Sequence, residues 1–395
     1  MRKATQQQTK NHNKRLILKT IYDRSEISRA SIARSTRLTR TTVSTIVAEL
    51  IADDLVVEIG PVAADRGKPP ILLNVPDSSR HLIGVDLANS EFRGAVLDLR
   101  GNILFRHSLP VANRSSQAAL ELVYELVETL LAATARPLLG IGIGTPGLMD
   151  AENGVILQAI DLDWQNLPLR HLLEDRFRLP VYVANDSQAA ALGEFIFGQR
   201  QSDSNLVVLK AGRGIGAGIV LNRQLYYGDH SGAGEIGHIT VVENGKLCRC
   251  GHFGCLETVA SSRAIVEAAQ HIAQTDANSC LHQYATTPDR ITTELVHQVL
   301  QAGDEAVQRL INEAGHYLSI AIANIIGLLD VGHIVVAGSM ARFGNALLDP
   351  IQSRLQQRAL ASLVQKSEVS ISHLGQDIVV QGAAAILLSQ ELGLV

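Results

Sequence analysis

From residue 81 onward, short apolar runs alternate with longer segments of helical period, and this alternation admits few architectures. The run 81–85 ends in Asp86, and the run 181–184 ends in an Asn-Asp pair. Between such runs, a segment rich in Ala, Leu and Val near 116–133 predicts a helix. Polar residues at strand ends are typical of α/β proteins, whose binding sites form where the carboxyl ends of strands meet. The sequence therefore predicts an α/β body.

The chain has 395 residues, which is too long for a single compact core, so more than one domain is expected. Residues 1–76 carry a pattern of their own, because three short helices are expected within 14–55, with Ser28 and Thr39 as N-caps of the second and third. Two strands follow at 55–59 and 71–75, joined by a loop at 60–70 that is expected to be the wing. This order predicts a winged helix-turn-helix domain over 1–76.

The charge distribution gives this amino-terminal domain a candidate partner. Residues 1–80 contain fourteen Lys and Arg against eight Asp and Glu, whereas the rest contains 21 against 31. A basic head on an acidic body favours contact of the head with a polyanion, and we expect that polyanion to be DNA. The side chains expected to contact DNA are Arg37, Thr39, Arg40, Thr41, Thr42 and Ser44 around the start of the third helix, and Arg66 and Lys68 in the wing. A small helical module that binds protein is the alternative.

Cysteine spacing points to a metal. Three of the four cysteines fall within eight residues, and one histidine precedes them. The set is His238, Cys248, Cys250 and Cys255. One imidazole and three thiolates form a closed tetrahedral set, so we expect structural zinc, with an unmetallated cysteine loop as the alternative. His252 is expected to be a loop residue, and Cys280 an ordinary buried residue.

These motifs resemble a known family. The segment Gly-Ala-Gly-Glu-Ile-Gly-His at 232–238, followed by Cys-x-Cys-Gly-x-x-Gly-Cys-x-Glu ending at Glu257, is similar to the signature of the ROK family of repressors and kinases. The similarity extends to Gly-Thr-Pro-Gly at 144–147, Asn-Asp at 185–186 and the glycine-rich segment 212–218. A helix-turn-helix ahead of such a body resembles ROK repressors of the xylose-repressor, NagC and Mlc type.

The resemblance implies a two-lobed fold like that of actin and hexokinase, with a sugar bound between the lobes. The first lobe would span 80–190, joined by a carboxyl-terminal helix at 382–395, and the second lobe, carrying the zinc site, would span 191–381. The family's sugar contacts fall on Asn185, Asp186, Glu235, His238 and Glu257. In the family, the histidine both ligates zinc and contacts the sugar.

Two departures from the kinases of the family favour a sensor over an enzyme. Asp186 corresponds to their general base, but Asp86 to Ser90 reads Asp-Leu-Ala-Asn-Ser where kinases have a Gly-Gly-Thr turn for phosphate. Arg213 replaces a Thr in the second phosphate loop. We therefore expect Asp186 to be a vestigial base and productive ATP binding to be lost. The alternatives are an ATP-dependent sugar kinase that retains a DNA-binding head, and a module that responds to a phosphotransferase component.

The resemblance also implies the partners. We expect operator DNA, a small neutral sugar such as xylose or glucose, and a homodimer or tetramer. Glucose is not assumed, because Asp161 stands where family kinases carry an Asn three residues before Trp164. The basic start lacks the apolar core of a signal peptide, and no apolar run is long enough to span a membrane, so a cytoplasmic protein with no membrane partner is expected. The head is expected to join the first lobe only through a short segment near Pro76.

Overall fold

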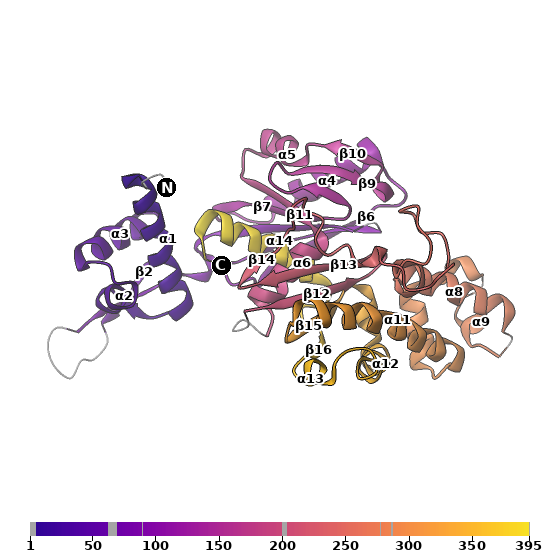
Figure 1. Ribbon diagram of the computed structural model, residues 1–395. Coiled ribbons are helices and arrows are strands. Elements are labelled where there is room, and N and C mark those ends of the chain that lie inside the picture. The colour runs from indigo at the N-terminus through magenta and orange to yellow at the C-terminus, as the bar shows by residue number, and fades with distance from the viewer. Residues whose placement is uncertain are drawn as a thin grey trace.

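The computed structural model places an amino-terminal head beside a body of two α/β lobes, with the chain's carboxyl end next to the head (Figure 1). The structure describes residues 5–61, 69–88, 90–199, 204–276, 278–285 and 287–394. Within these ranges, no helix has both the length and the apolar composition needed to cross a membrane. The α/β body behind a small helical head agrees with the predicted architecture.

The head is a three-helix unit closed by a small antiparallel sheet of order β1-β3-β2. Its elements are α1 (Gln6–Arg24), β1 (Ile27–Ser28), α2 (Arg29–Thr36), α3 (Arg40–Ala52), β2 (Val57–Pro61) and β3 (Ile71–Asn74). Both predicted N-caps are present, because Ser28 Oγ accepts from the Ser31 amide at 3.2 Å and Thr39 Oγ1 from the Thr42 amide at 3.1 Å. Apolar side chains of all three helices, among them Ile21, pack into one core.

The first helix begins earlier than predicted. Thr5 caps it, since its hydroxyl accepts from the Gln8 amide at 3.2 Å while its own amide donates to Gln8 Oε1 at 2.8 Å. This reciprocal pair is a capping box, and it starts the helix within a polar stretch that has no apolar stripe. The prediction that placed the helical region at 14–55 was wrong at this end because it relied on apolar periodicity alone.

The first lobe is built on a mixed sheet of order β11-β7-β4-β5-β6, in which β4, β7 and β11 are parallel and β5 and β6 are antiparallel neighbours. A 3-10 turn, η1 (Asp77–Ser79), leads into it. The elements that follow are β4 (His81–Leu87), β5 (Glu91–Leu97), β6 (Ile103–Pro110), α4 (Ser116–Ala132), β7 (Leu138–Thr145), β8 (Leu148–Asp150), β9 (Val155–Ala159), η2 (Ile160–Leu162), β10 (Trp164–Leu167), α5 (Leu169–Phe177) and β11 (Val181–Asn185). Because β4 and β7 are buried throughout most of their length, helices are required on both faces of the sheet.

The second lobe has a sheet of order β14-β13-β12-β15-β16 with helices packed against it. Its strands are β12 (Leu206–Ala211), β13 (Ile215–Leu221), β14 (Gln224–Leu225), β15 (His333–Ala337) and β16 (Glu368–Ile371). Its helical elements are η3 (Ile236–His238), α7 (Glu257–Ala260), α8 (Ser262–Thr275), α9 (Leu281–Tyr284), η4 (Pro288–Arg290), α10 (Thr293–Gln301), α11 (Glu305–Leu329), η5 (Ser339–Phe343), α12 (Asn345–Leu355), α13 (Ala361–Val364) and η6 (Gly375–Asp377). The long α11 buries one continuous face in the core of this lobe.

Two helices cross between the lobes (Figure 1). α6 (Asp186–Phe197), which spans the predicted boundary between residues 190 and 191, packs on β12 and β13 of the second lobe. α14 (Ile378–Leu387) packs on β4 and β7 of the first lobe and on α6. It begins four residues before the predicted start at 382, and the π-helical turn η7 (Leu388–Leu392) follows it.

The head is attached to the body by more than the segment near Pro76. Tyr22 donates its hydroxyl to the Leu99 carbonyl at 2.6 Å, and the Arg100 guanidinium lies 3.8 Å from the centre of the Tyr22 ring. Arg15 donates to the Gln390 carbonyl at 2.8 Å, which joins α1 to the π-helical turn η7. The expectation that the head joins the first lobe only through this short segment was therefore wrong, because α1 also contacts the body.

Candidate functional site

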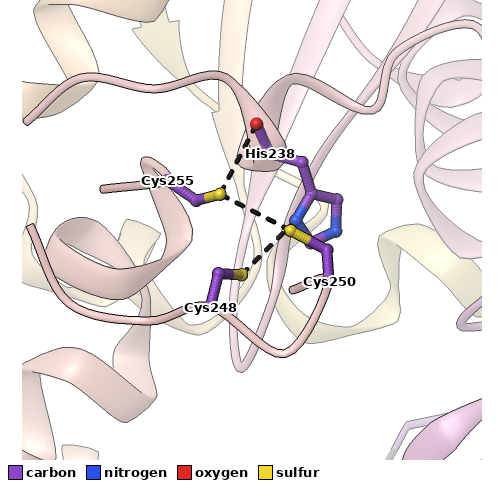
Figure 2. Close-up of side chains that lie close together, drawn as sticks. All are labelled: His238, Cys248, Cys250 and Cys255. Atoms are coloured by element: carbon purple, nitrogen blue, oxygen red, sulfur yellow. Dashed lines mark hydrogen bonds between the residues drawn. The ribbon is translucent and has the colours of Figure 1, made fainter. Parts of the chain in front are cut away.

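The four predicted metal ligands lie together (Figure 2). The ligand atoms of His238, Cys248, Cys250 and Cys255 are all within 4.8 Å of one another. Cys248 Sγ lies 3.6 Å from His238 Nδ1, and Cys250 Sγ lies 3.6 Å from Cys255 Sγ. His238 comes from the 3-10 turn η3, whereas the cysteines come from the loop before α7.

The shape of the cysteine loop is set by backbone hydrogen bonds and two glycines. The Cys248 amide donates to the His252 carbonyl at 2.7 Å, and the Gly251 amide donates back to the Cys248 carbonyl at 3.0 Å. Gly251 and Gly254 have φ of 89° and 72°, in the left-handed region that favours glycine. At Gly254 a Cβ would lie only 1.7 Å from the Val242 carbonyl oxygen. The loop therefore needs glycine at 254 to bring its thiols together.

The arrangement fits zinc. Tetrahedral Zn–S bonds of about 2.3 Å place two sulfurs about 3.8 Å apart, close to the observed 3.6 Å between Cys250 and Cys255. Burial, reinforced by the two neighbouring thiols, raises the pKa of the Cys255 thiol to about 12, so a metal binding there displaces its proton. The donor set leaves no protein position open for a substrate, which fits a structural and not a catalytic metal.

Asn185 and Asp186 stand where β11 passes into α6. Asn185 Oδ1 accepts from the Ser187 amide at 2.9 Å and so caps α6, while its Nδ2 donates to the Gly147 carbonyl at 3.1 Å. This bond ties the helix start to the predicted Gly-Thr-Pro-Gly turn. Asp186 is buried and faces Lys210 of β12, with Oδ2 2.8 Å from the ammonium nitrogen.

Glu235, His238 and Glu257 complete the predicted sugar set from the second lobe. His238 Nε2 lies 4.0 Å from a Glu235 carboxylate oxygen, on the opposite side of the ring from the nitrogen that faces Cys248. Partial burial raises the pKa of Glu235, and the carboxylates of Asp186 and Glu257 add to the shift. Glu257 accepts from the Ile215 amide at 3.1 Å. The structure therefore places Glu235 beside His238, with Asp186 and Glu257 close enough to act on Glu235 by charge. The role of these residues toward a sugar stays a prediction.

Asp161 is held by three arginines. Arg249, which lies between Cys248 and Cys250, donates to Asp161 Oδ1, while Arg213 and Arg263 each lie 3.4 Å from Oδ2. The charges of these guanidiniums outweigh burial and lower the pKa of Asp161. The carboxylate belongs to η2 of the first lobe, whereas the arginines belong to the second. Asp161 is thus an ionic contact between the lobes, and Arg213 is directed to it.

Sequence reasoning noted Asp86 at the end of a strand but missed Lys210 and the charge interaction between the two. Lys210 interrupts the apolar strand β12 (Leu-Val-Val-Leu-Lys-Ala), and a lone lysine in such a run is the signal that could have revealed a buried charge. Burial favours the neutral amine, but Asp186 and Asp86 outweigh it, so the pKa of Lys210 lies above its ordinary value. Burial raises the pKa of Asp86 to about 6, despite the nearby ammonium group of Lys210.

The structure describes only part of the segment that stands where kinases of the family have their first phosphate loop. β4 ends at Leu87 and β5 begins at Glu91, so the segment that replaces the glycine turn is a short hairpin connection. Asn89 lies outside the described residues. Ala88 follows β4 directly.

The predicted DNA-contacting side chains lie around the start of α3. Arg37, Arg40, Thr41 and Ser44 are exposed. Thr39 and Thr42 are also there, but their hydroxyls bond each other at 2.8 Å and Thr39 caps the helix, so both serve the helix start first. Arg66 and Lys68 of the predicted wing lie outside the described residues.

Comparison with known proteins matches this arrangement of head and body. A model described as the ROK family matches residues 82–390, and one described as winged helix-turn-helix DNA-binding matches residues 10–57. The chain belongs to the ROK family. The predicted family, the two-lobed ROK body and the helix-turn-helix head are thereby confirmed.

Proteins similar to this ROK protein include transcriptional regulators and a sugar kinase. A xylose repressor of Caldicellulosiruptor bescii is 32% identical over 384 residues, covering 96% of each chain. A solved ROK family transcriptional regulator, described as a homologue of the Escherichia coli MLC protein, has a TM-score of 0.86 at 30% identity and covers 98% of each chain. A glucokinase of Halalkalibacterium halodurans is 33% identical but covers 80% of this chain and 97% of its own. The similarity to these regulators thus includes the head.

Proposed function

We propose that this ROK protein is a sugar-responsive transcriptional repressor, in which a sugar bound between the lobes alters operator binding by the head. The observation that carries the proposal is similarity over almost the whole chain, head included, to a xylose repressor and to a transcriptional regulator. This similarity bears out the prediction of a regulator and not an enzyme. A function on operator DNA would place the protein in the cytoplasm.

The sugar would lie against Glu235 and His238 and the neighbouring carboxylates. Sugar hydroxyls donate and accept, so Asn185, Asp186, Glu235 and Glu257 offer the complementary groups. Zinc would be held by the Cys3His set and fix the orientation of His238, whose Nε2 faces Glu235. We keep the effector as a small neutral sugar such as xylose or glucose.

Phosphoryl transfer is disfavoured by two ion pairs. The candidate base Asp186 already has Oδ2 occupied by the ammonium group of Lys210 at 2.8 Å, so this oxygen is not free to accept a proton from a sugar hydroxyl. Arg213, in the second phosphate loop, pairs with Asp161 and so directs its side chain across this loop. An ATP-dependent sugar kinase remains the alternative, favoured by the retained Asp186.

A chain of packed elements connects the predicted sugar-contacting residues to the head. Asp186 begins α6, α6 crosses α14, and α14 continues into η7, whose Gln390 carbonyl accepts from Arg15 of α1. A sugar that favours one arrangement of the lobes would shift the crossing of these two helices and so move α1. The shift in operator affinity can be no larger than the sugar's differential affinity for the two arrangements.

The functional unit is proposed to be a homodimer, or a dimer of dimers, that presents two heads to a two-fold operator. Each head would contribute one recognition helix to one half-site. Sedimentation velocity at micromolar concentration tests this, because a monomer with full operator affinity would contradict it.

Replacing Arg40 with alanine tests the DNA-contacting face. Arg40 is exposed in the first turn of α3, so its loss is expected to weaken operator binding by about 1–3 kcal/mol, roughly 5- to 150-fold, and to relax base preference. Arg309→Ala on α11 is the matched control, since it removes an exposed cation from the body. Lys68→Ala is expected to weaken operator binding and to reduce the slope of the logarithm of the binding constant against the logarithm of salt concentration by about one. Operator titrations across salt concentrations that leave Arg40→Ala equal to Arg309→Ala would remove α3 as the reading helix.

Replacing Asp186 with asparagine tests the coupling between sugar and operator. The variant keeps the side-chain shape but removes the charged acceptor, so the sugar should shift its operator affinity less than it shifts the parent's, where typical couplings are about 1–3 kcal/mol. Operator binding without sugar should stay at the parent level. The measurement is an operator titration with and without the best-binding sugar.

The control for this titration is Asp175→Asn, which removes an exposed carboxylate from α5 of the first lobe. Equal sugar sensitivity of Asp186→Asn and the parent would exclude Asp186 from the sensor. ADP release by the parent, measured with the same sugars and ATP, separates the kinase alternative, because sustained sugar-dependent turnover would establish an enzyme.

A further inference from the structure

One ammonium group, that of Lys210, lies near two buried carboxylates at the meeting of the lobes. Lys210 Nζ lies 2.8 Å from Asp186 Oδ2, and the second carboxylate, Asp86, is close enough to interact with both by charge. The three side chains come from β12, α6 and β4, which are separate elements brought together by the fold. A single positive charge therefore faces two negative charges.

Asp86 is the unusual member of this group. It is only 3% exposed, and its Oδ1 has no hydrogen-bond partner among the described residues. A buried carboxylate oxygen without a partner costs free energy unless a cation neutralises it. The other charges that act on Asp86 are Arg93 and Glu91, which pair with each other at 2.8 Å. Lys210 is therefore the cation that compensates Asp86.

We propose that Lys210 is a built-in counter-cation of this site, which neutralises Asp86 and Asp186 in place of a divalent metal ion and keeps such an ion out. Paired carboxylates with a free oxygen are the ligand type that Mg²⁺ and Mn²⁺ take. A lysine held by its own strand supplies positive charge at every concentration of metal. The site thus stays assembled without metal or nucleotide, as a regulator of this kind requires.

Removing the ammonium group should reveal the cation site. Lys210→Ser leaves two carboxylates without a counter-charge and frees the space of the lysine side chain. We expect this full-length variant, loaded with zinc and stripped of other metals, to bind one Mn²⁺ at least tenfold more tightly than the parent. Titration followed by the electron paramagnetic resonance signal of free Mn²⁺ measures this, and Mn²⁺ should raise the melting temperature of the variant but not of the parent.

Two further variants make the test specific. Lys366→Ser removes an exposed lysine from the second lobe and should bind Mn²⁺ as the parent does. Adding Asp86→Asn to Lys210→Ser should return Mn²⁺ binding to the parent level. If Lys210→Ser binds no more tightly than the parent, or if Asp86→Asn leaves its Mn²⁺ binding intact, the proposal is overturned.

A second, compensating substitution keeps the test decisive if Lys210→Ser alone fails to fold. Lys210→Ser combined with Asp186→Asn removes the cation and one carboxylate together. Recovery of folded protein in this pair, where Lys210→Ser alone does not fold, supports the counter-charge role. Equal loss in both would assign Lys210 to packing and contradict the proposal. The experiment needs neither sugar nor operator, so its failure is separate from failure of the proposed repressor function.

Discussion

Cys255→Ser is expected to release zinc and lower the melting temperature of the protein by roughly 5–11 °C. The estimate takes a metal present at 100 times its dissociation constant, which stabilises the folded state by about 2.7 kcal/mol, and a shift of about 2–4 °C per kcal/mol for a domain of 150–250 residues. Cys255 is fully buried and faces both Cys250 and the His238 carbonyl, so solvent water has no open path to replace its thiolate as a ligand.

The same variant should also blunt the sugar response. His238, which faces Glu235, and Arg249, which donates to Asp161, both belong to the metal-bound segment. Loss of the metal would release both side chains from their positions. The loss of sugar response should therefore be larger than the lower stability of the variant alone would cause.

Cys280→Ser is the matched control, because Cys280 is the one cysteine outside the cluster and is half-buried. It should keep one equivalent of zinc per chain and most of the parent's melting temperature. Metal analysis of protein purified without chelator and a thermal melt give both readouts. A parent without zinc, or a Cys255→Ser variant with a full equivalent, would refute the Cys3His assignment.

The fold was predictable where a secondary-structure element is determined by residues close together in the sequence, as by apolar periodicity or a capping side chain. Periodicity predicted α4, and Thr39 indicated the start of α3 through its capping hydroxyl. The capping box at Thr5 has no apolar signal, so the start of α1 was missed. Strands β8, β9 and β10 were missed as well, because their pairing depends on a partner strand and not on a run of their own.

The candidate site divides in the same way. The ligand set of the metal was predictable because its thiols and imidazole are close in sequence. The Lys210 pair with Asp186 and the three arginines on Asp161 join segments 24 to 102 residues apart, and such pairs depend on how the lobes meet. Docking of α1 through Arg15 and Gln390 joins residues 375 apart, and no local pattern predicts it.

The crossing of α6 and α14 depends on two glycines. A Cβ at Gly382 would lie 1.7 Å from the Ala189 carbonyl oxygen and 2.4 Å from its carbonyl carbon. At Gly193 it would lie 2.5 Å from the Ile378 carbonyl oxygen. These neighbours are backbone atoms within helices, so they cannot turn aside as a flexible side chain can. The two helices can approach this closely only because neither carries a side chain at the contact.

Gly382→Ala is therefore expected to destabilise the protein by about 3 kcal/mol or more, at the upper end of overpacking in a core. Gly327→Ala is the control, since Gly327 lies in the helix α11 with no atom within 4 Å of its added Cβ, and there alanine should stabilise by up to about 1 kcal/mol. Thermal melts of both variants and the parent give the comparison, and operator titration with sugar shows whether a forced change of the crossing reaches the head. The prediction would be contradicted if Gly382→Ala had the same melting temperature as Gly327→Ala and kept the parent's sugar response. The helix crossing would then neither limit stability nor transmit sugar binding to the head.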